Sequence, residues 1–146
     1  MYVIVLFVFI TLAIMVYDHF VSRKGPETIS FWFTSDKSLE QIGQILEKAG
    51  MIHAHDVEGE NVWEWIEIGS PTGEYGVNIS RRHGDYTYPV HIKVLYDDKK
   101  SSLDLRDQLG TQLAKILKTD IKAGTVEHIS GNEFEFREEG LFRYAD

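Results

Sequence analysis

TISFWFT at residues 28–34, followed by LEQIGQILEKAG at residues 39–50, is the stretch that decides the fold. In the first segment Ile29, Phe31 and Phe33 occupy every second position. This is the period of a β-strand that buries one face, so we expect a strand here. The second segment has a different period, which indicates that the strand leads directly into a helix.

The second segment is typical of an amphipathic helix. Its apolar residues recur every three or four positions: Leu39, Ile42, Ile45, Leu46 and Ala49. Ser35 or Asp36 is expected to cap the N-terminus, because their side-chain oxygens accept hydrogen bonds from free backbone N–H groups. Gly50 suits the C-terminal end, where a left-handed backbone is common.

A similar string recurs later in the chain. Residues 39–46 (LEQIGQIL) and 106–113 (RDQLGTQL) share a pattern and place a glycine in the middle of each helix. Mid-helix glycine lowers helix stability relative to alanine, so Gly43 and Gly110 favour close packing at these points. The string indicates either two βα units related by pseudo-symmetry or a chance likeness of two amphipathic helices.

The other segments predict strands in consecutive pairs. These are Met51–Asp56 with Asn61–Ile68 around a turn at 57–60, Tyr75–Arg81 with Tyr86–Tyr96, and Thr125–Ser130 with Glu133–Arg137 across Gly131-Asn132. The second helix, begun by Ser101 or Ser102, precedes the last pair. This order predicts an α+β, ferredoxin-like (split βαβ) two-layer sandwich, with an antiparallel sheet and two helices on one face. A sheet that clasps one helix in another topology is the alternative.

The N-terminal stretch is the most apolar part of the chain. From Met1 to Tyr17 it reads MYVIVLFVFITLAIMVY, without a charged side chain. With the next few residues it reaches the length of about 20 residues that a transmembrane helix needs. A cleaved signal peptide fits less well, because no basic residue precedes the run and no small-residue cleavage pattern follows it. We expect a transmembrane anchor helix at residues 1–22, a linker at 23–26 and a soluble α+β domain at 27–146.

The flanking charges predict the orientation of this anchor. Arg23 and Lys24 follow the apolar segment, and no basic side chain precedes it. Because cytoplasmic flanks carry an excess of Lys and Arg, we expect a single-pass inner (cytoplasmic) membrane protein with its C-terminal domain in the cytoplasm. The opposite, periplasmic orientation stays open, since only these charges decide it.

The composition excludes several function classes. The chain has 146 residues with 23 acidic and 15 basic side chains, a net charge of −8 and no cysteine. A protein without cysteine has no disulfide framework, zinc finger, iron–sulfur cluster or thiol nucleophile. The acidic balance argues against a nucleic-acid partner, which needs a concentrated cationic face.

The sheet face opposite the helices is expected to be aromatic. Strand alternation places Trp32, Trp63, Trp65 and Leu95 there. Because large exposed apolar patches usually mark interaction surfaces, we predict a partner-binding site at Trp32, Trp63, Trp65, Glu64, Glu67 and Leu95. In the alternative, the C-terminal segment folds back and covers this face with Phe134, Phe136, Leu141, Phe142 and Tyr144.

Candidates for metal binding or catalysis are few. His53 and His55 form an H-x-H pair near carboxylates, but an isolated pair is common and no third ligand is identifiable. Ser80, His83 and Asp85 have the residue types of a catalytic triad without a nucleophile-elbow motif. We therefore predict no catalytic residue, metal centre or other cofactor.

These features favour a non-enzymatic, protein-binding domain held at the lipid bilayer. An acidic surface speeds association with a partner that has a basic surface. By functional analogy alone, such a protein suits an immunity-type role in which it neutralises a toxin by direct binding. The alternative is a membrane-tethered sensor or enzyme that binds a metal or small ligand through His53 and His55.

Overall fold

One antiparallel sheet with two covering helices forms the folded domain. The computed structural model describes residues 4–5, 8–15, 27–53, 56–60, 62–69, 75–96 and 102–146. From residue 27 the elements are β1 (Glu27–Phe33), α2 (Leu39–Lys48), β2 (Glu58–Glu60), β3 (Trp63–Gly69), β4 (Tyr75–Arg82), β5 (Val90–Tyr96), α3 (Ser102–Leu117), β6 (Ile121–Ser130) and β7 (Glu133–Phe142). The strands lie in the order β2-β3-β4-β5-β1-β6-β7, and each neighbouring pair is antiparallel. The predicted α+β class is confirmed.

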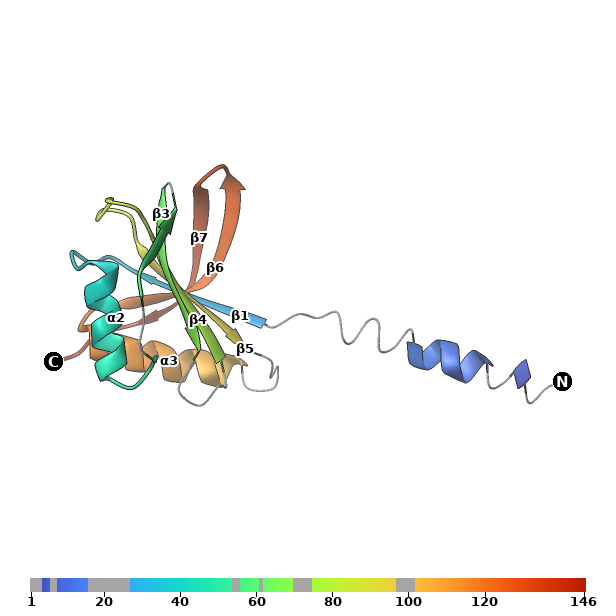
Figure 1. The fold of residues 1–146 in the computed structure, drawn as a ribbon. Helices are drawn as coiled ribbons and strands as arrows, with labels where there is room; N and C mark the ends of the chain where they lie inside the picture. The colour runs from blue at the N-terminus through green and yellow to red at the C-terminus, as the bar shows by residue number, and fades with distance from the viewer. Residues whose placement is uncertain are drawn as a thin grey trace.

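The helices α2 and α3 lie on the same side of the sheet (Figure 1). α2 contacts β3 and β4, α3 contacts β1, β6 and β7, and the two helices also contact each other. Together they cover one face along most of its width. The opposite face is therefore left to other parts of the chain.

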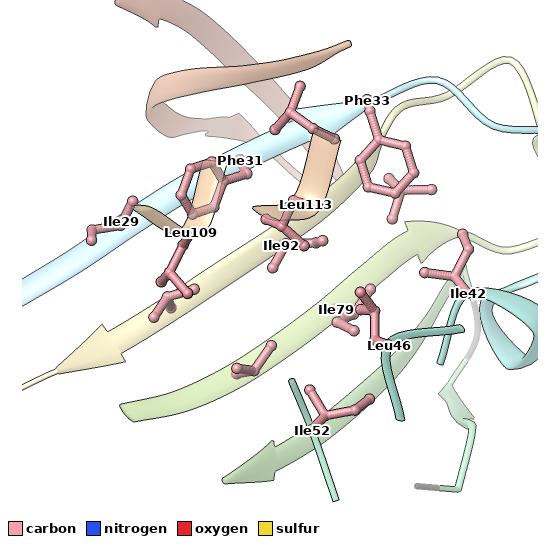
Figure 2. Close-up of a cluster of buried hydrophobic side chains, with 14 of the residues drawn as sticks. Ile29, Phe31, Phe33, Ile42, Leu46, Ile52, Ile79, Ile92, Leu109 and Leu113 are labelled. Atoms are coloured by element: carbon pink, nitrogen blue, oxygen red, sulfur yellow. The ribbon is translucent and has the colours of Figure 1, made fainter. Parts of the chain in front are cut away.

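The hydrophobic core fills the space between the helices and the sheet. Ile29, Phe31 and Phe33 of β1 are buried, as their alternation predicts. Figure 2 shows these side chains beside those of the neighbouring strands and of the helices. The main partners are Ile79 of β4, Ile92 of β5, Ile42 and Leu46 of α2, and Leu109 and Leu113 of α3. Burial of this apolar surface is the main stabilising contribution to the domain.

The helix α2 begins later than the predicted cap. Its N-cap is Ser38, whose hydroxyl accepts a hydrogen bond from the Gln41 backbone N–H, while the Gln41 side chain accepts from the Ser38 N–H. This reciprocal capping box satisfies two backbone donors at once, which explains why Ser38 is preferred over Ser35 or Asp36. Gly50 has a φ of 75°, as expected for the residue that ends the helix.

Gly110 of α3 is a point of close packing, as predicted. A Cβ atom there would lie about 2.5 Å from the ring of Phe142 at the end of β7. The Phe142 ring in turn contacts Phe31 of β1, with ring centroids 6.3 Å apart. Phe142 therefore packs on the helix side of the sheet, so its predicted place on the opposite face is wrong.

The predicted strand Met51–Asp56 is also wrong. Residues 51–53 form no strand, and residues 54–55 lie outside the described part. The strand β2 (Glu58–Glu60) lies within the segment 57–60, which is predicted as a turn. Ile52 is buried against the core, and the Met51 carbonyl accepts a hydrogen bond from the Tyr75 hydroxyl. These side chains are apolar because a loop packs on the core, and an apolar loop resembles a strand in sequence.

The strand β5 begins at Val90, not at Tyr86. Pro89 has no N–H to donate to a neighbouring strand, and the Asp85 carboxylate accepts hydrogen bonds from the Thr87 N–H and hydroxyl, which favours a turn. The period of β5 does not extend to Tyr88. Alternation with Val90, Ile92 and Val94 predicts that the Tyr88 side chain faces the helices, which is wrong, because its ring contacts Trp63 and Phe136.

Residues 8–15 are helical near the N-terminus. Their large apolar side chains are more than half exposed: Val8, Phe9, Ile10, Leu12, Ile14 and Met15. Within the part of the chain that the structure describes, no helix combines the length and the apolar character required to span a membrane. The predicted linker at 23–26 and much of the predicted anchor at 1–22 lie outside the described residues.

Candidate functional site

The last two strands fold over the face of the sheet that α2 and α3 leave free. β6 pairs with β1 only between Trp32↔Lys122 and Ser30↔Gly124, whereas its pairing with β7 continues to Ser130↔Glu133. A register shift at Ala123/Gly124 is typical of a β-bulge, which bends a strand. Figure 1 shows the far ends of β6 and β7 rising away from α3. We call residues 124–138 the hairpin arm.

Gly124 permits the close approach of the two strands in this arm. A Cβ atom at Gly124 would overlap the carbonyl oxygen of Arg137 on β7. Because glycine has no Cβ, the two backbones come closer than any other residue would allow. Gly124 is thus a bend inside β6, which begins at Ile121 and not at the predicted Thr125.

Aromatic contacts hold the hairpin arm over the sheet. The ring centroids of Phe136 and Trp32 lie 5.3 Å apart, and those of Phe134 and Trp63 lie 5.4 Å apart. The Trp63 indole N–H also donates a hydrogen bond of 3.3 Å to the side-chain oxygen of Asn132, in the turn of the arm. Tilted and edge-to-face pairs of this kind add to the stabilisation from buried area. The arm therefore connects β7 at one edge of the sheet with β3 near the other.

A cavity of about 220 Å³ lies between the hairpin arm and the sheet. Seven residues from four strands line it: Trp63, Trp65, Asn78, Ser80, His91, Phe134 and Phe136. The register aligns Trp65, Ser80 and His91 on three neighbouring strands, so their side chains share one row. The cavity is thus mainly aromatic, with a polar strip on the sheet.

His91 is uncharged at neutral pH. Burial, with a smaller contribution from the positive charge of Lys93, lowers its pKa from 6.5 to about 4. Its Nε2 atom lies 3.1 Å from the Ser30 hydroxyl, which gives the ring a polar partner. No charged side chain is found among the described residues that line the cavity.

The structure places the predicted partner-binding residues in different environments. Trp32 is only 6% exposed because Phe136 covers it, and Trp63 and Trp65 are half-buried in the cavity wall. The predicted alternative, in which the C-terminal segment covers this face, is confirmed for Phe134 and Phe136. Trp32 is therefore not exposed to a partner as the open-face prediction requires.

The remaining members of the predicted site lie outside the cavity. The Glu64 side chain is on the helix side of β3, 3.4 Å from Arg81 on β4, because alternation places it with Ile66. Glu67 is exposed, and Leu95 is half-buried. Glu64 is therefore on the other face from the tryptophans, whereas Glu67 and Leu95 are on the free face but outside the cavity lining.

The candidate metal ligands are not assembled in the described residues. His53 is exposed and His55 lies outside the described part. Among the residues that the structure describes, no group of three or more His, Cys, Asp and Glu side chains could hold a metal ion.

The triad candidates Ser80, His83 and Asp85 are not brought together either. Ser80 lines the cavity, whereas the His83 ring lies 3.7 Å from Glu64, whose side chain is on the other face. The Asp85 carboxylate accepts hydrogen bonds from Thr87, and these hold the pKa of Asp85 below its usual value. The three side chains therefore point to different surroundings and do not form a triad.

Sequence reasoning missed the polar strip of Asn78, Ser80 and His91 as a unit. Its signal is present, because each residue occupies an outward position on β4 or β5 where the core residues alternate with it. The alternation of Phe134 and Phe136 on β7 also marks one apolar face. The bend of β6 at Gly124 brings Phe134 and Phe136 over the polar strip. The sequence around Gly124 does not predict the direction of this bend.

Comparisons of the chain with protein-family models, curated proteins and solved structures found no match.

Proposed function

We propose that the chain is a membrane-tethered, non-enzymatic domain that binds a small molecule in the cavity beneath the hairpin arm. The observation that carries the proposal is the cavity of about 220 Å³, walled by four aromatic side chains and three polar ones. Apolar pockets with a few convergent polar groups are the usual form of small-molecule sites. A domain whose only task is packing fills such a space with side chains.

Binding suits these residues better than catalysis. A general base works best when its pKa lies near the operating pH, and the lowered pKa of His91 makes it a weak base at neutral pH. The His91 Nε2 atom is paired with Ser30, which lies outside the cavity lining. Ser80 has no hydrogen bond to His91 that would activate its hydroxyl as a nucleophile.

The tether belongs to the same proposal. Residues 8–15 are helical and expose their large apolar side chains, and the surrounding sequence from Met1 to Tyr17 carries no charge. A helix of this kind is stabilised when lipid covers it. We expect the full chain to sediment with membranes and to resist extraction by alkaline carbonate; recovery in the aqueous fraction would contradict the tether.

We further infer that the domain is an elaborated ferredoxin-like sandwich. β1 and β4 run in the same direction with the antiparallel strand β5 between them, and β6 flanks β1. This arrangement matches a split βαβ unit. The strands β2, β3 and β7 extend it at the edges, and the cavity lies between the extensions.

Ser80→Leu tests the proposed function by filling the cavity. We expect ligand-detected NMR with a mixture of uncharged one-ring and two-ring aromatic fragments to identify ligands of the full chain. Leucine adds apolar volume where the fragment would lie, so Ser80→Leu should raise the dissociation constant at least about tenfold. Ser130→Leu makes the same change at an exposed position of β6 and should leave binding unchanged.

Two outcomes would contradict the proposal. One is that no fragment binds the wild-type chain. The other is that fragments bind equally well to a folded Ser80→Leu variant, which would locate them outside the cavity. Thermal unfolding of both variants shows whether each is folded.

A second candidate is capture of a protein with a basic surface, as in the immunity-type role. The observation in its favour is the outer surface of the hairpin arm, where Glu127, Glu133 and Glu135 are exposed and Ile129 is 60% exposed. Acidic surfaces with a few apolar side chains suit such partners. Ser80→Leu separates the two functions, because it fills the cavity and leaves these side chains in place.

A further inference from the structure

We infer that the ligand of the cavity is a neutral, planar molecule of one or two fused aromatic rings that carries one hydrogen-bonding group, of the indole or phenol class. This inference rests on the proposed function and specifies its ligand. Four properties of the cavity independently limit the chemical class of the ligand. They are its volume, its aromatic walls, its unpaired polar side chains and its uncharged lining.

The volume sets the size of the ligand. Pockets for drug-sized molecules usually measure about 300–1,000 Å³, whereas an engineered apolar cavity of about 150 Å³ accommodates benzene. At about 220 Å³, this cavity lies between the two. It therefore fits one or two fused rings and is too small for most cofactors.

The walls favour a flat, aromatic ligand. Trp63, Trp65, Phe134 and Phe136 supply the apolar surface, and the Trp63 and Phe134 rings meet edge to face at 89°. Aromatic rings prefer stacked or edge-to-face neighbours over aliphatic chains of similar area. A planar ligand ring can make stacked contacts through its faces and edge-to-face contacts through its edge with these four side chains.

The polar strip predicts a hydrogen-bonding group on the ligand. Asn78 and Ser80 line the cavity, and neither side chain makes a hydrogen bond to another residue that the structure describes. An amide and a hydroxyl can each donate and accept, so the strip accommodates an N–H, an O–H or a carbonyl. A ligand group that pairs with them satisfies polar atoms that a purely apolar ligand would leave without partners.

The lining also disfavours a charged ligand. The described lining residues are uncharged, and burial keeps His91 neutral at pH 7. A carboxylate or ammonium group in the cavity would lose its hydration without gaining an opposite charge, which is strongly unfavourable. Binding is therefore expected to select against ions.

Three bicyclic probes, of which indole and indene have nearly equal shape, test the ligand class on the full chain by isothermal titration calorimetry. Indole has an N–H group, indene lacks it, and indole-3-carboxylate adds a negative charge. We expect indole to bind with one-to-one stoichiometry and indene about five- to tenfold more weakly, because it leaves the polar strip unpaired. Indole-3-carboxylate should bind at least about 100-fold more weakly than indole.

Asn78→Ala and Ser80→Ala link this preference to the strip. In the double variant, indole should bind no more than about twofold more tightly than indene, and indene should still bind. Ser130→Ala is the matched control and should keep the wild-type ratio.

Failure of the ligand class is distinguishable from failure of the proposed function. Equal affinity for indole and indene, a ratio unchanged in the double variant, or tight binding of the carboxylate would overturn the ligand class. If other fragments bind and none of these probes does, the class is likewise wrong while the cavity remains a binding site. If no fragment binds at all, the proposed function is wrong too.

Discussion

Replacing Arg81 by methionine should lower the free energy of unfolding by about 3–5 kcal/mol, the range for removing one partner of a buried ion pair. Arg81 is 1% exposed, and its Nη2 atom lies 3.4 Å from Glu64 Oε1. Nη1 donates to the carbonyl oxygens of Lys37 and Ser35, before α2, and the guanidinium stacks on Tyr86. Methionine fills much of the space but leaves Glu64 without its counter-charge.

Urea denaturation of the full chain measures this effect. Arg82→Met is the matched control, because Arg82 is the exposed neighbour and its replacement should change stability by less than about 0.5 kcal/mol. Indole binding should persist in folded Arg81→Met, since the pair lies on the face opposite the cavity. A loss below about 1 kcal/mol in Arg81→Met would show that the ion pair contributes little.

Acidification should destabilise the protein through His91. The unfolded chain binds a proton there near pH 6.5, whereas the folded chain does so only near pH 4, because burial disfavours the charged ring. Between these values the unfolded state holds more protons, so the free energy of unfolding falls as the pH decreases. The full difference corresponds to about 3 kcal/mol, and above pH 7 His91 contributes no pH dependence.

His91→Gln isolates this contribution. Urea denaturation at pH 7 and pH 4.5 should show a smaller loss of stability on acidification in the variant than in the wild type. His53→Gln, at an exposed position, should follow the wild-type curve. Identical losses for wild type and His91→Gln would mean that His91 is not kept neutral by the fold.

Local patterns predicted the elements that bury one regular face. Ile29, Phe31 and Phe33 identified β1, and Gly50 marked the end of α2 where the backbone is left-handed. Gly110 indicated close packing and is in contact range of Phe142. For β1 and Gly50 the physical cause lies within a few residues of the signal, whereas Gly110 indicated close packing without identifying its distant partner, Phe142.

The predictions that were wrong depend on distant parts of the chain. Met51 and Ile52 are apolar because a loop covers the core, and Tyr88 turns toward Trp63 because β5 begins only after Pro89. The cavity forms because Gly124 lets β6 bend toward the free face. Such contacts join residues far apart in sequence, and no local period determines them.

The hairpin arm covers the free face of the sheet and forms one wall of the aromatic cavity. The most direct test is a nuclear Overhauser measurement on the full chain without ligand. We expect cross-peaks between the ring protons of Trp63 and Phe134 and between those of Trp32 and Phe136, because the ring centroids lie 5.4 Å and 5.3 Å apart, respectively. Assigned spectra that lack both sets of cross-peaks would show that the arm does not cover this face, and would contradict the account.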